Sequence, residues 1–538
     1  MTTIDTHVGA SLGASAQAPS LVAALGHWVT SSDHKRIGRL YVGWSLLFAV
    51  SVTVIGALLG LERMRPDGLQ VVHGDAVLQI VSFYRYALVL AVLAPLFVGI
   101  AVCVVPMQIG ARAIALPRLA QASFWLWLFG AIMVVVALVG NGGPGGGATD
   151  LVDLYLLGLA VTAAGLVAAS VSVATTVLTS RTVGMSLDRV PAFSWAALVG
   201  SVATLLSLPV AIGTVIYLYV DHTYAKVAFG GNSGLDGHLR WSLSQPQTFV
   251  FVVMALGVLA ELAPLAGRTR QPFRSVVLGG VGLVSTGVLG AVTQSTHMLV
   301  WNGSAADKLQ SLVLFLIFNG LPLLGIIVVL ASSLLSLRER VASVAPSFVF
   351  AITGSLLVLA GAAGHFFSMI DSTDLGGTAF EEGVVLYLVL GGVLAAIGGL
   401  VHWSPKLWGR VLPERRLFPV AVIGLFGAIA AAFPLYVAGL SGQDLDLAYG
   451  FDYDGPIALW NGLSAVGFAL VILALLAFLG VLVSAVVSGE QAPDDPWNGQ
   501  TLEWGLPSPA PVNNADALAV VNSGEPLLDV KPSQEVSS

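Results

Sequence analysis

Charged residues and cysteine are both scarce in this sequence. Only 10% of its 538 residues are Asp, Glu, Lys or Arg, whereas an ordinary soluble domain carries roughly 25%. This composition excludes a soluble globular protein. The single cysteine, Cys103, excludes internal disulfides and metal clusters held by several thiolates. The net charge is −7, and no nucleic-acid partner is expected.

Hydrophobic residues and glycine dominate instead. The chain is 56% hydrophobic with 61 glycines, and its mean hydropathy is +0.88. Small residues suit helices in lipid, because they let backbones approach closely where no hydrophobic effect drives helices together. Several stretches are long enough to cross a hydrocarbon core of about 30 Å. These twelve stretches are 40–60, 86–106, 122–140, 152–179, 194–219, 248–267, 275–295, 309–333, 346–369, 384–403, 417–440 and 457–488. The predicted fold is all-α, a polytopic membrane bundle of twelve transmembrane helices.

Lysine and arginine predict the orientation of this bundle. With an even number of spans, both termini lie on the same side of the membrane. The N-terminal segment and the even-numbered connections carry sixteen Lys and Arg residues. The odd-numbered connections carry only six, which are Arg63, Arg65, Arg85, Lys226, Arg240 and Lys308. The positive-inside rule therefore predicts that both termini are cytoplasmic.

Three regions follow from this pattern. Residues 1–38 form a cytoplasmic N-terminal segment, 39–488 the twelve-helix domain, and 489–538 a cytoplasmic C-terminal tail. Residues 18–30 are apolar on one helical face but too short to span, which predicts an interfacial helix. Ser32 or Asp33 would cap the first spanning helix. The tail is polar, with prolines and little periodicity, which predicts extended or disordered chain at its end.

Several short strings along the chain match one known family. They are Asp33-His34-Lys35-Arg36-Ile37-Gly38, Pro106-Met107-Gln108-Ile109-Gly110-Ala111, Gly184-Met185 with Pro191, Phe193 and Trp195, Gly398-Gly399-Leu400-Val401-His402-Trp403, and Thr501-Leu502-Glu503-Trp504. These strings resemble the heme-copper oxidases, specifically subunit I of cytochrome c oxidase. They run from the first span to the tail, where the match is to bacterial members. The resemblance implies a twelve-helix fold in a bacterial-type cell membrane.

The resemblance also implies a set of cofactors. The family buries two hemes and a copper ion, held by six histidines, because a neutral imidazole binds iron or copper without adding charge to a low-dielectric interior. In this chain the six ligand positions fall on Tyr84, Gln245, Thr296, His297, Gly383 and Val385. An alternative register places the first on Phe83. Only His297 has an imidazole, so it is the sole candidate metal residue, and we predict no catalytic or cofactor-binding residue and no bound cofactor.

Two of these positions have a second interpretation. Tyrosine can ligate heme iron, but a tyrosine near the end of a span is usually an amphipathic anchor, and we interpret Tyr84 in that way. One imidazole does not hold a copper ion, because structural metal sites generally need three or four ligands. We therefore interpret His297 as a hydrogen-bonded histidine at the membrane interface.

Other positions with chemical roles in the family have changed as well. The proton-carrying glutamate and the cross-linked tyrosine fall on Gln247 and Phe249. An amide cannot exchange a proton near neutral pH, and phenylalanine has no phenol to oxidise. The arginine pair that faces the heme propionates falls on Leu445 and Asp446. A carboxylate there would repel a propionate.

Proton delivery shows the same pattern. The aspartate and the lysine that begin the family's two proton routes fall on Ala113 and near Ile326. Glu261 is an acid near the inner end of the sixth span, a place that ordinarily suggests function. We interpret it as one partner of an interfacial ion pair with Arg268 and Arg270.

These changes favour a non-catalytic homologue of subunit I, a structural or regulatory protein of a respiratory membrane. Its expected partners are the other membrane subunits of an oxidase-like complex, and lipid. The alternative is an active cytochrome c oxidase subunit I, which would take electrons from cytochrome c, reduce O2 and pump protons. A transporter or channel ranks third, because the sequence supplies no polar pathway.

Overall fold

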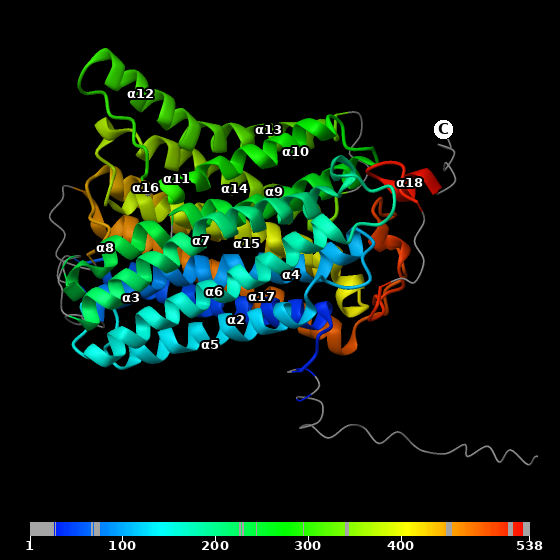
Figure 1. Ribbon diagram of the computed structural model, residues 1–538, viewed down its shortest axis with the longest axis horizontal. Helices are drawn as coiled ribbons and strands as arrows, with labels where there is room; N and C mark the ends of the chain where they lie inside the picture. Colours follow the sequence, from blue (N-terminus) through cyan, green and yellow to red (C-terminus); the bar gives the residue numbers. More distant parts are fainter. Residues whose placement is uncertain are drawn as a thin grey trace, which may run out of the picture.

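Helices form nearly all of the regular structure in this computed structural model (Figure 1). The structure describes residues 30–65, 76–224, 231–243, 245–293, 295–338, 344–447, 455–514 and 520–530, with single positions at 26, 28, 68 and 228. The α-helices are α2 (His34–Glu62), α3 (Ala76–Ala87), α4 (Ala94–Gln108), α5 (Pro117–Val139), α6 (Thr149–Thr179), α7 (Ala192–Thr223), α8 (Gly231–Leu243), α9 (Gln245–Gly267), α10 (Arg274–Val284), α11 (Leu289–Thr293), α12 (Ala305–Phe315), α13 (Leu321–Leu335), α14 (Pro346–Ser368), α15 (Ala379–Trp408), α16 (Glu414–Leu440), α17 (Ile457–Ser488) and α18 (Pro526–Val530). Short 3-10 helices are η2 (Leu187–Arg189), η3 (Ser285–Val288), η5 (Asp371–Thr373) and η6 (Leu502–Gly505), and π-helices are η1 (Leu88–Leu93) and η4 (Leu316–Gly320).

The described part of the chain contains 12 helical segments long and apolar enough to cross a membrane. The prediction of an all-α, twelve-span membrane bundle is therefore confirmed. The second segment begins at Ala76, earlier than the predicted start at residue 86. Its first turns carry the polar residues Gln79, Ser82 and Arg85, which lower the hydropathy and so kept these turns out of the predicted span. All three residues are buried inside the protein.

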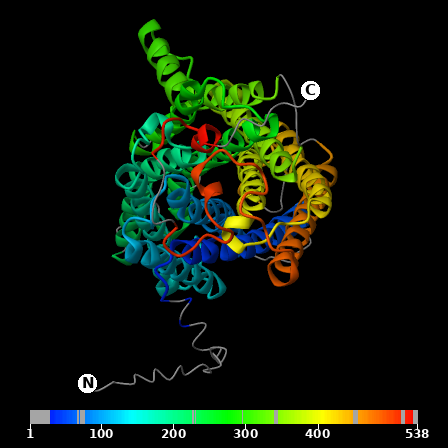
Figure 2. The same ribbon diagram turned by 90° about the vertical axis from the view of Figure 1, so that its right-hand side faces the viewer.

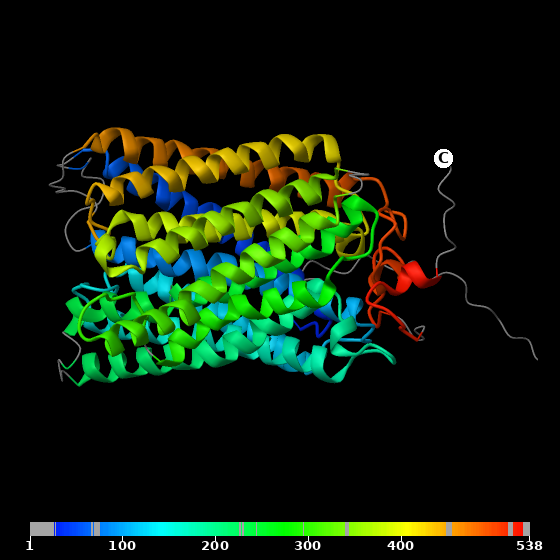
Figure 3. The ribbon, with the colours of Figure 1, turned by 90° about the horizontal axis from the view of Figure 1, so that it is seen from above.

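The spans run side by side along one direction, so that the connections gather at two opposite ends (Figures 1 and 3). We call the end that carries the C-terminal tail the tail end, and the opposite one the far end. Three spans form the centre: the apolar windows of Ala76–Gln108, Gln247–Gly267 and Ala379–Trp408 are 100%, 89% and 94% buried, whereas the other windows reach at most 61%. These three central spans carry three of the six ligand positions that the resemblance implies, Tyr84, Gly383 and Val385.

Two spans contain a π-helical turn that ends two residues before a proline. η1 precedes Pro95 and η4 precedes Pro322. A proline ring has no N–H and clashes with the carbonyl four residues earlier, so a wider turn relieves the clash. Leu88, the first residue of η1, lines the first cavity described below.

The C-terminal tail crosses the tail end of the bundle (Figure 2). Leu502, Glu503, Trp504 and Leu506 are all buried, so the part of the tail within residues 489–514 is packed against the helices. The predicted disorder concerned the end of the tail, and residues 531–538 lie outside the described chain. At the other terminus, Asp33 caps α2 by accepting from the backbone N–H of Lys35 at 3.1 Å, and most of the predicted interfacial helix at 18–30 lies outside the described residues.

The contact between α16 and α17 gives a direct test of this packing. A Cβ on Gly467 would lie 2.6 Å from Cα of Ala431, so Gly467→Ala is expected to lower the free energy of unfolding by about 1–3 kcal/mol. Gly480 lies on the same helix with no atom within 4 Å of a Cβ. Gly480→Ala is expected to leave stability unchanged or raise it by up to about 1 kcal/mol, since alanine is the better helix former. Denaturation of both variants in detergent measures the difference, and equal effects would contradict this packing.

Candidate functional site

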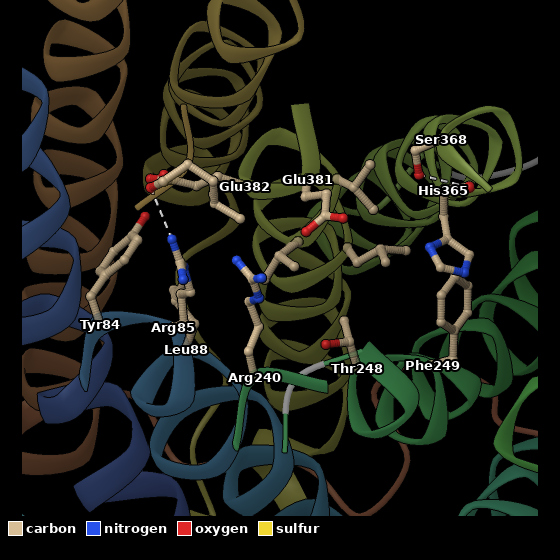
Figure 4. A pocket seen from close by; sticks show the side chains of 14 residues that line it. Tyr84, Arg85, Leu88, Arg240, Thr248, Phe249, His365, Ser368, Glu381 and Glu382 are labelled. Atoms are coloured by element: carbon tan, nitrogen blue, oxygen red, sulfur yellow. Dashed lines mark hydrogen bonds between the residues drawn. The ribbon is translucent and has the colours of Figure 1, made fainter. Parts of the chain in front are cut away.

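A first cavity lies near the far end of the bundle, between α3, η1, α9, α14 and α15 (Figure 4). Tyr84 and Leu88 line it from the second span, and Val385 lines it from the tenth. Its volume is about 30 Å³ measured to the centres of water molecules, which is room for roughly two waters. The structure therefore brings two of the six ligand positions, Tyr84 and Val385, to one small space.

Tyr84 lies in the protein interior. Its exposure is 1%, its hydroxyl has no hydrogen-bond partner, and its ring meets Phe468 edge-on at 6.2 Å. The interpretation as an interfacial anchor is therefore wrong, because protein surrounds the ring. Phe83 lines a separate cavity with Phe48 and Tyr86, so Tyr84 is the residue that faces the first cavity.

Gly383 is closed off by an aromatic ring from the neighbouring helix. A Cβ on Gly383 would lie 2.6 Å from Cδ1 of Tyr436. The Tyr436 ring stacks on Phe380 with centroids 4.2 Å apart, and its hydroxyl donates to the carbonyl of Ala360 at 3.3 Å. A histidine at position 383 would have to displace Tyr436. The space beside this ligand position is therefore filled by protein.

Thr296 and His297 lie beyond the end of the seventh span. α11 ends at Thr293, so both residues belong to the irregular segment that follows it, where His297 has a positive φ of 50°. The His297 ring stacks on Phe318 with centroids 3.9 Å apart, and its Nε2 lies 2.7 Å from Oγ1 of Thr293. Partial burial lowers the pKa of His297. These contacts are consistent with a hydrogen-bonded histidine, and metal binding at His297 stays a prediction.

A second cavity, of about 40 Å³ by the same measure, lies next to the first and is lined by Thr296 and Asn319. Phe249 and His365 line both cavities, and their ring centroids are 4.9 Å apart. Gln247 is fully buried and accepts a hydrogen bond from Ser207 at 3.0 Å. An apolar ring and an amide thus stand where the family has its tyrosine and glutamate.

The side chain of Gln245, the remaining ligand position, lies outside the described residues. Gln245 itself is the first residue of α9. His365, by contrast, is a well-described imidazole between the two cavities that sequence reasoning left among scattered histidines. It corresponds to none of the six ligand positions.

A network of charges closes the far end of the first cavity; Arg85 and Asp236 are buried in it, whereas Arg240 and Asp446 are partly exposed. Arg85 pairs with Asp446 at 2.8 Å and lies 3.6 Å from Asp236. Arg240 pairs with the same Asp446 at 3.2 Å. Figure 4 shows both arginines extending toward the start of α15. Asp236 also accepts from Tyr86 at 2.7 Å and from Ser82.

A second ion pair adjoins this network. Arg63 pairs with Glu382 at 2.7 Å, and the two side chains are 2% and 4% exposed. Arg63 also donates to the carbonyl of Leu445 at 3.3 Å, and Arg85 donates to the same carbonyl at 2.9 Å. The positions that carry an arginine pair in the family thus supply acceptors here. Asp446 pairs with two arginines of this chain. The sequence predicted only that its charge would repel a propionate, and these ion pairs were not expected.

Glu261, at the tail end, does not form the expected ion pair. Its carboxylate accepts from the backbone N–H of Phe193 at 3.3 Å, and Arg270 instead pairs with Asp529 at 2.6 Å. The interpretation that joined Glu261 to Arg268 and Arg270 is therefore wrong, because the tail supplies Arg270 with its own acid. Ile326 is buried in α13, and Ala113 lies in the loop after α4.

The donor set does not fit two hemes and a copper ion. Within the described chain, no group of three or more His, Cys, Asp or Glu residues is placed to hold a metal ion. Tyr84 and Val385 face a space that holds only a few waters, and Tyr436 occupies the place beside Gly383. Valine and glycine have no atom that binds iron. No chemical step through these groups follows from this geometry.

One sequence signal could have revealed the charge network. Arg63, Arg85 and Arg240 are three of the six basic residues on the sparsely charged side of the chain. A charge beside an apolar span ordinarily has a specific partner. The acids lie far away in the sequence, in α8, in α15 and after α16, so hydropathy alone could not assign the pairs.

Comparison with known proteins identifies what this arrangement is similar to. The family model described as "Cytochrome C and Quinol oxidase polypeptide I" matches residues 36–476. A putative cytochrome c oxidase subunit 1-beta of Streptomyces coelicolor is 30% identical over 541 residues, covering 95% of this chain and 91% of that protein. Cytochrome c oxidase subunit 1 of Bacillus subtilis is 25% identical, covering 93% of this chain and 82% of that protein.

A solved structure supports the same fold. A cryo-EM structure of a heme-copper terminal oxidase dimer matches with a TM-score of 0.63 and 13% sequence identity, covering 85% of both chains. At this identity the match concerns the arrangement of helices alone.

The pair of Arg63 and Glu382 can be tested by a double-mutant cycle. Arg63→Leu is expected to lower the free energy of unfolding by about 3–5 kcal/mol, because it leaves Glu382 buried without a partner. The double variant R63L/E382L is expected to regain much of this loss, since neither charge remains. Arg65 is exposed, and Arg65→Leu is the control, with an expected change within about 0.5 kcal/mol. A single variant R63L as stable as the wild type would show that the pair does not hold the far end.

Proposed function

This chain belongs to the cytochrome c and quinol oxidase polypeptide I family, and from that premise we propose that it is a non-catalytic member. Its function would be that of a structural or regulatory subunit of an oxidase-like complex in a respiratory membrane. The observation that carries the proposal is the loss of ligands: five of the six positions hold Tyr84, Gln245, Thr296, Gly383 and Val385.

The geometry supports the proposal beyond the count of histidines. Tyr436 fills the space beside Gly383, and the far end carries its own acids where propionates would otherwise meet arginines. Phe249 and Gln247 supply neither a phenol nor an exchangeable proton. Function depends on the site and not on the fold, so shared architecture alone does not favour an active oxidase.

The partners follow from the family. Subunits of this class work beside other membrane subunits, and we infer that this chain packs with such subunits and with lipid. A protein of this kind would hold or regulate an assembly whose chemistry takes place elsewhere. Cytochrome c would be a partner only under the oxidase alternative.

The decisive test of the non-catalytic proposal is metal and heme content. The full chain, purified from its native membrane and separated from its partner subunits, is expected to show no heme bands in a dithionite-reduced optical spectrum. Iron and copper should lie well below one atom per chain, because the ligands that would retain them are missing. An active heme-copper oxidase carried through the same procedure provides the positive control. Stoichiometric heme and copper in this chain would establish the oxidase alternative instead.

We also infer that the tail end is cytoplasmic, because most Lys and Arg residues lie there. Alkaline phosphatase folds only where disulfides form, so a fusion to the full-length C-terminus is expected to be inactive. The matched fusion after Gly442, in the far-end connection between α16 and α17, is expected to be active. The reverse pattern in the two fusions would show that the bundle is inserted the other way round.

A further inference from the structure

The C-terminal tail places a carboxylate inside the tail end of the bundle. Glu503 is fully buried. Its Oε1 accepts from the side-chain amide of Gln108 at 3.0 Å and from the indole N–H of Trp403 at 3.2 Å. Its other oxygen, Oε2, is buried and has no hydrogen-bond partner among the described residues. A buried acceptor of this kind is costly unless something donates to it.

A second carboxylate lies in the same region. Glu261 on α9 accepts from the backbone N–H of Phe193 at 3.3 Å, and the Phe193 ring meets the ring of Trp403, which donates to Glu503, with centroids 4.8 Å apart. The negative charge of Glu503 acts on Glu261 across this short separation. Within the described chain neither glutamate forms an ion pair, and the nearby cations have other partners. Arg274 pairs with Glu525 at 3.0 Å, and Lys406 donates to the carbonyl of Asp494 at 2.7 Å and to that of Leu506.

Two carboxylates in such a place cannot both carry a charge at low cost. A proton on one of them would neutralise one charge and supply the donor that Glu503 Oε2 lacks. A third cavity, lined by Glu261, Gln271 and Thr501 and of about 20 Å³ measured to water centres, gives room for roughly one water beside Glu261. Gln271 Oε1 is a further acceptor there without a partner.

We propose that Glu261 and Glu503 form an acid pair that binds one proton, and that this proton holds the C-terminal tail against the membrane helices. The ligand of this site is the proton itself. The pair joins α9 to η6, so it links a central span to the tail. This inference goes beyond the proposed function and stands whether or not the chain binds heme.

The attachment of the tail depends on pH in a definite direction. Burial raises the pKa of the Glu503 carboxyl above its ordinary value, so the packed tail binds more protons than the detached tail. Attachment is therefore strongest below the ordinary glutamate pKa of about 4.3 and weakens as the pH rises toward the raised pKa.

Other ionisable groups face the same region. They are Lys406 and His402 on α15, Arg274 on α10, and Asp494, Asp495 and Glu525 in the tail. His402 meets Trp504 with ring centroids 4.8 Å apart, and its Nε2 is buried without a partner. The test below separates the glutamate pair from these groups by substitution.

Hydrogen exchange of the full chain in lipid nanodiscs measures tail opening directly. The opening constant of the peptide around residues 500–506, corrected for intrinsic exchange, is expected to rise by up to about tenfold per pH unit between pH 6 and 9. Glu503→Gln and Glu261→Gln each remove the shared proton and are expected to flatten this dependence. Asp529→Asn alters a tail carboxylate that pairs with Arg270 and is expected to keep it.

Two results would overturn the proposal. One is a wild-type opening constant that does not change with pH, and the other is an unchanged slope in both glutamine variants. Should Glu503→Gln fail to fold, Glu261→Gln carries the test alone. Infrared spectroscopy adds an independent readout: the wild type is expected to show a carboxylic acid band near neutral pH that Glu261→Gln loses, and its absence from the wild type would also overturn the pair.

Discussion

Three arginines near the far end of the bundle impose the strongest constraint on this structure. Arg63 and Arg85 are almost fully buried, and Arg240 is largely so. An unpaired charge in such surroundings is very costly. In the family that this chain resembles, arginines at the corresponding end face heme propionates. Here Glu382, Asp236 and Asp446 supply negative charges from within the protein, so each of the three arginines has an acidic partner.

Side chains of the protein itself also fill the interior of the bundle. The central spans remain the most buried part of the bundle, which preserves the scaffold of the family. Tyr436 stands against Gly383, and the rings of Phe249 and His365 separate two cavities that each hold only a few waters. Dry voids in a core cost about 24 cal/mol per Å³, so a site that loses a large cofactor must be filled. In this chain the ring of Tyr436 occupies the space beside Gly383.

The sequence predicted the fold well, because apolar length determines a spanning helix almost by itself. All twelve spans were found, whereas the loss of metal ligands that the aligned strings indicate stays a prediction. The errors concerned side-chain direction and distant partners. Tyr84 was expected at the surface because hydropathy places it near a span end, yet α3 extends the span and buries it. Asp446 was given no partner and Glu261 was given the wrong ones. The actual contacts, Arg85 with Asp446 and Asp529 of the tail with Arg270, join residues far apart in the sequence.

The central claim is that protein side chains occupy the places of the former metal sites. An experimental density map of the chain purified from its native membrane tests this claim most directly. The account predicts continuous side-chain density for Tyr436 against Gly383, and Asp446 between Arg85 and Arg240. Planar porphyrin density beside Tyr84 or Gly383, with either residue moved aside, would contradict it.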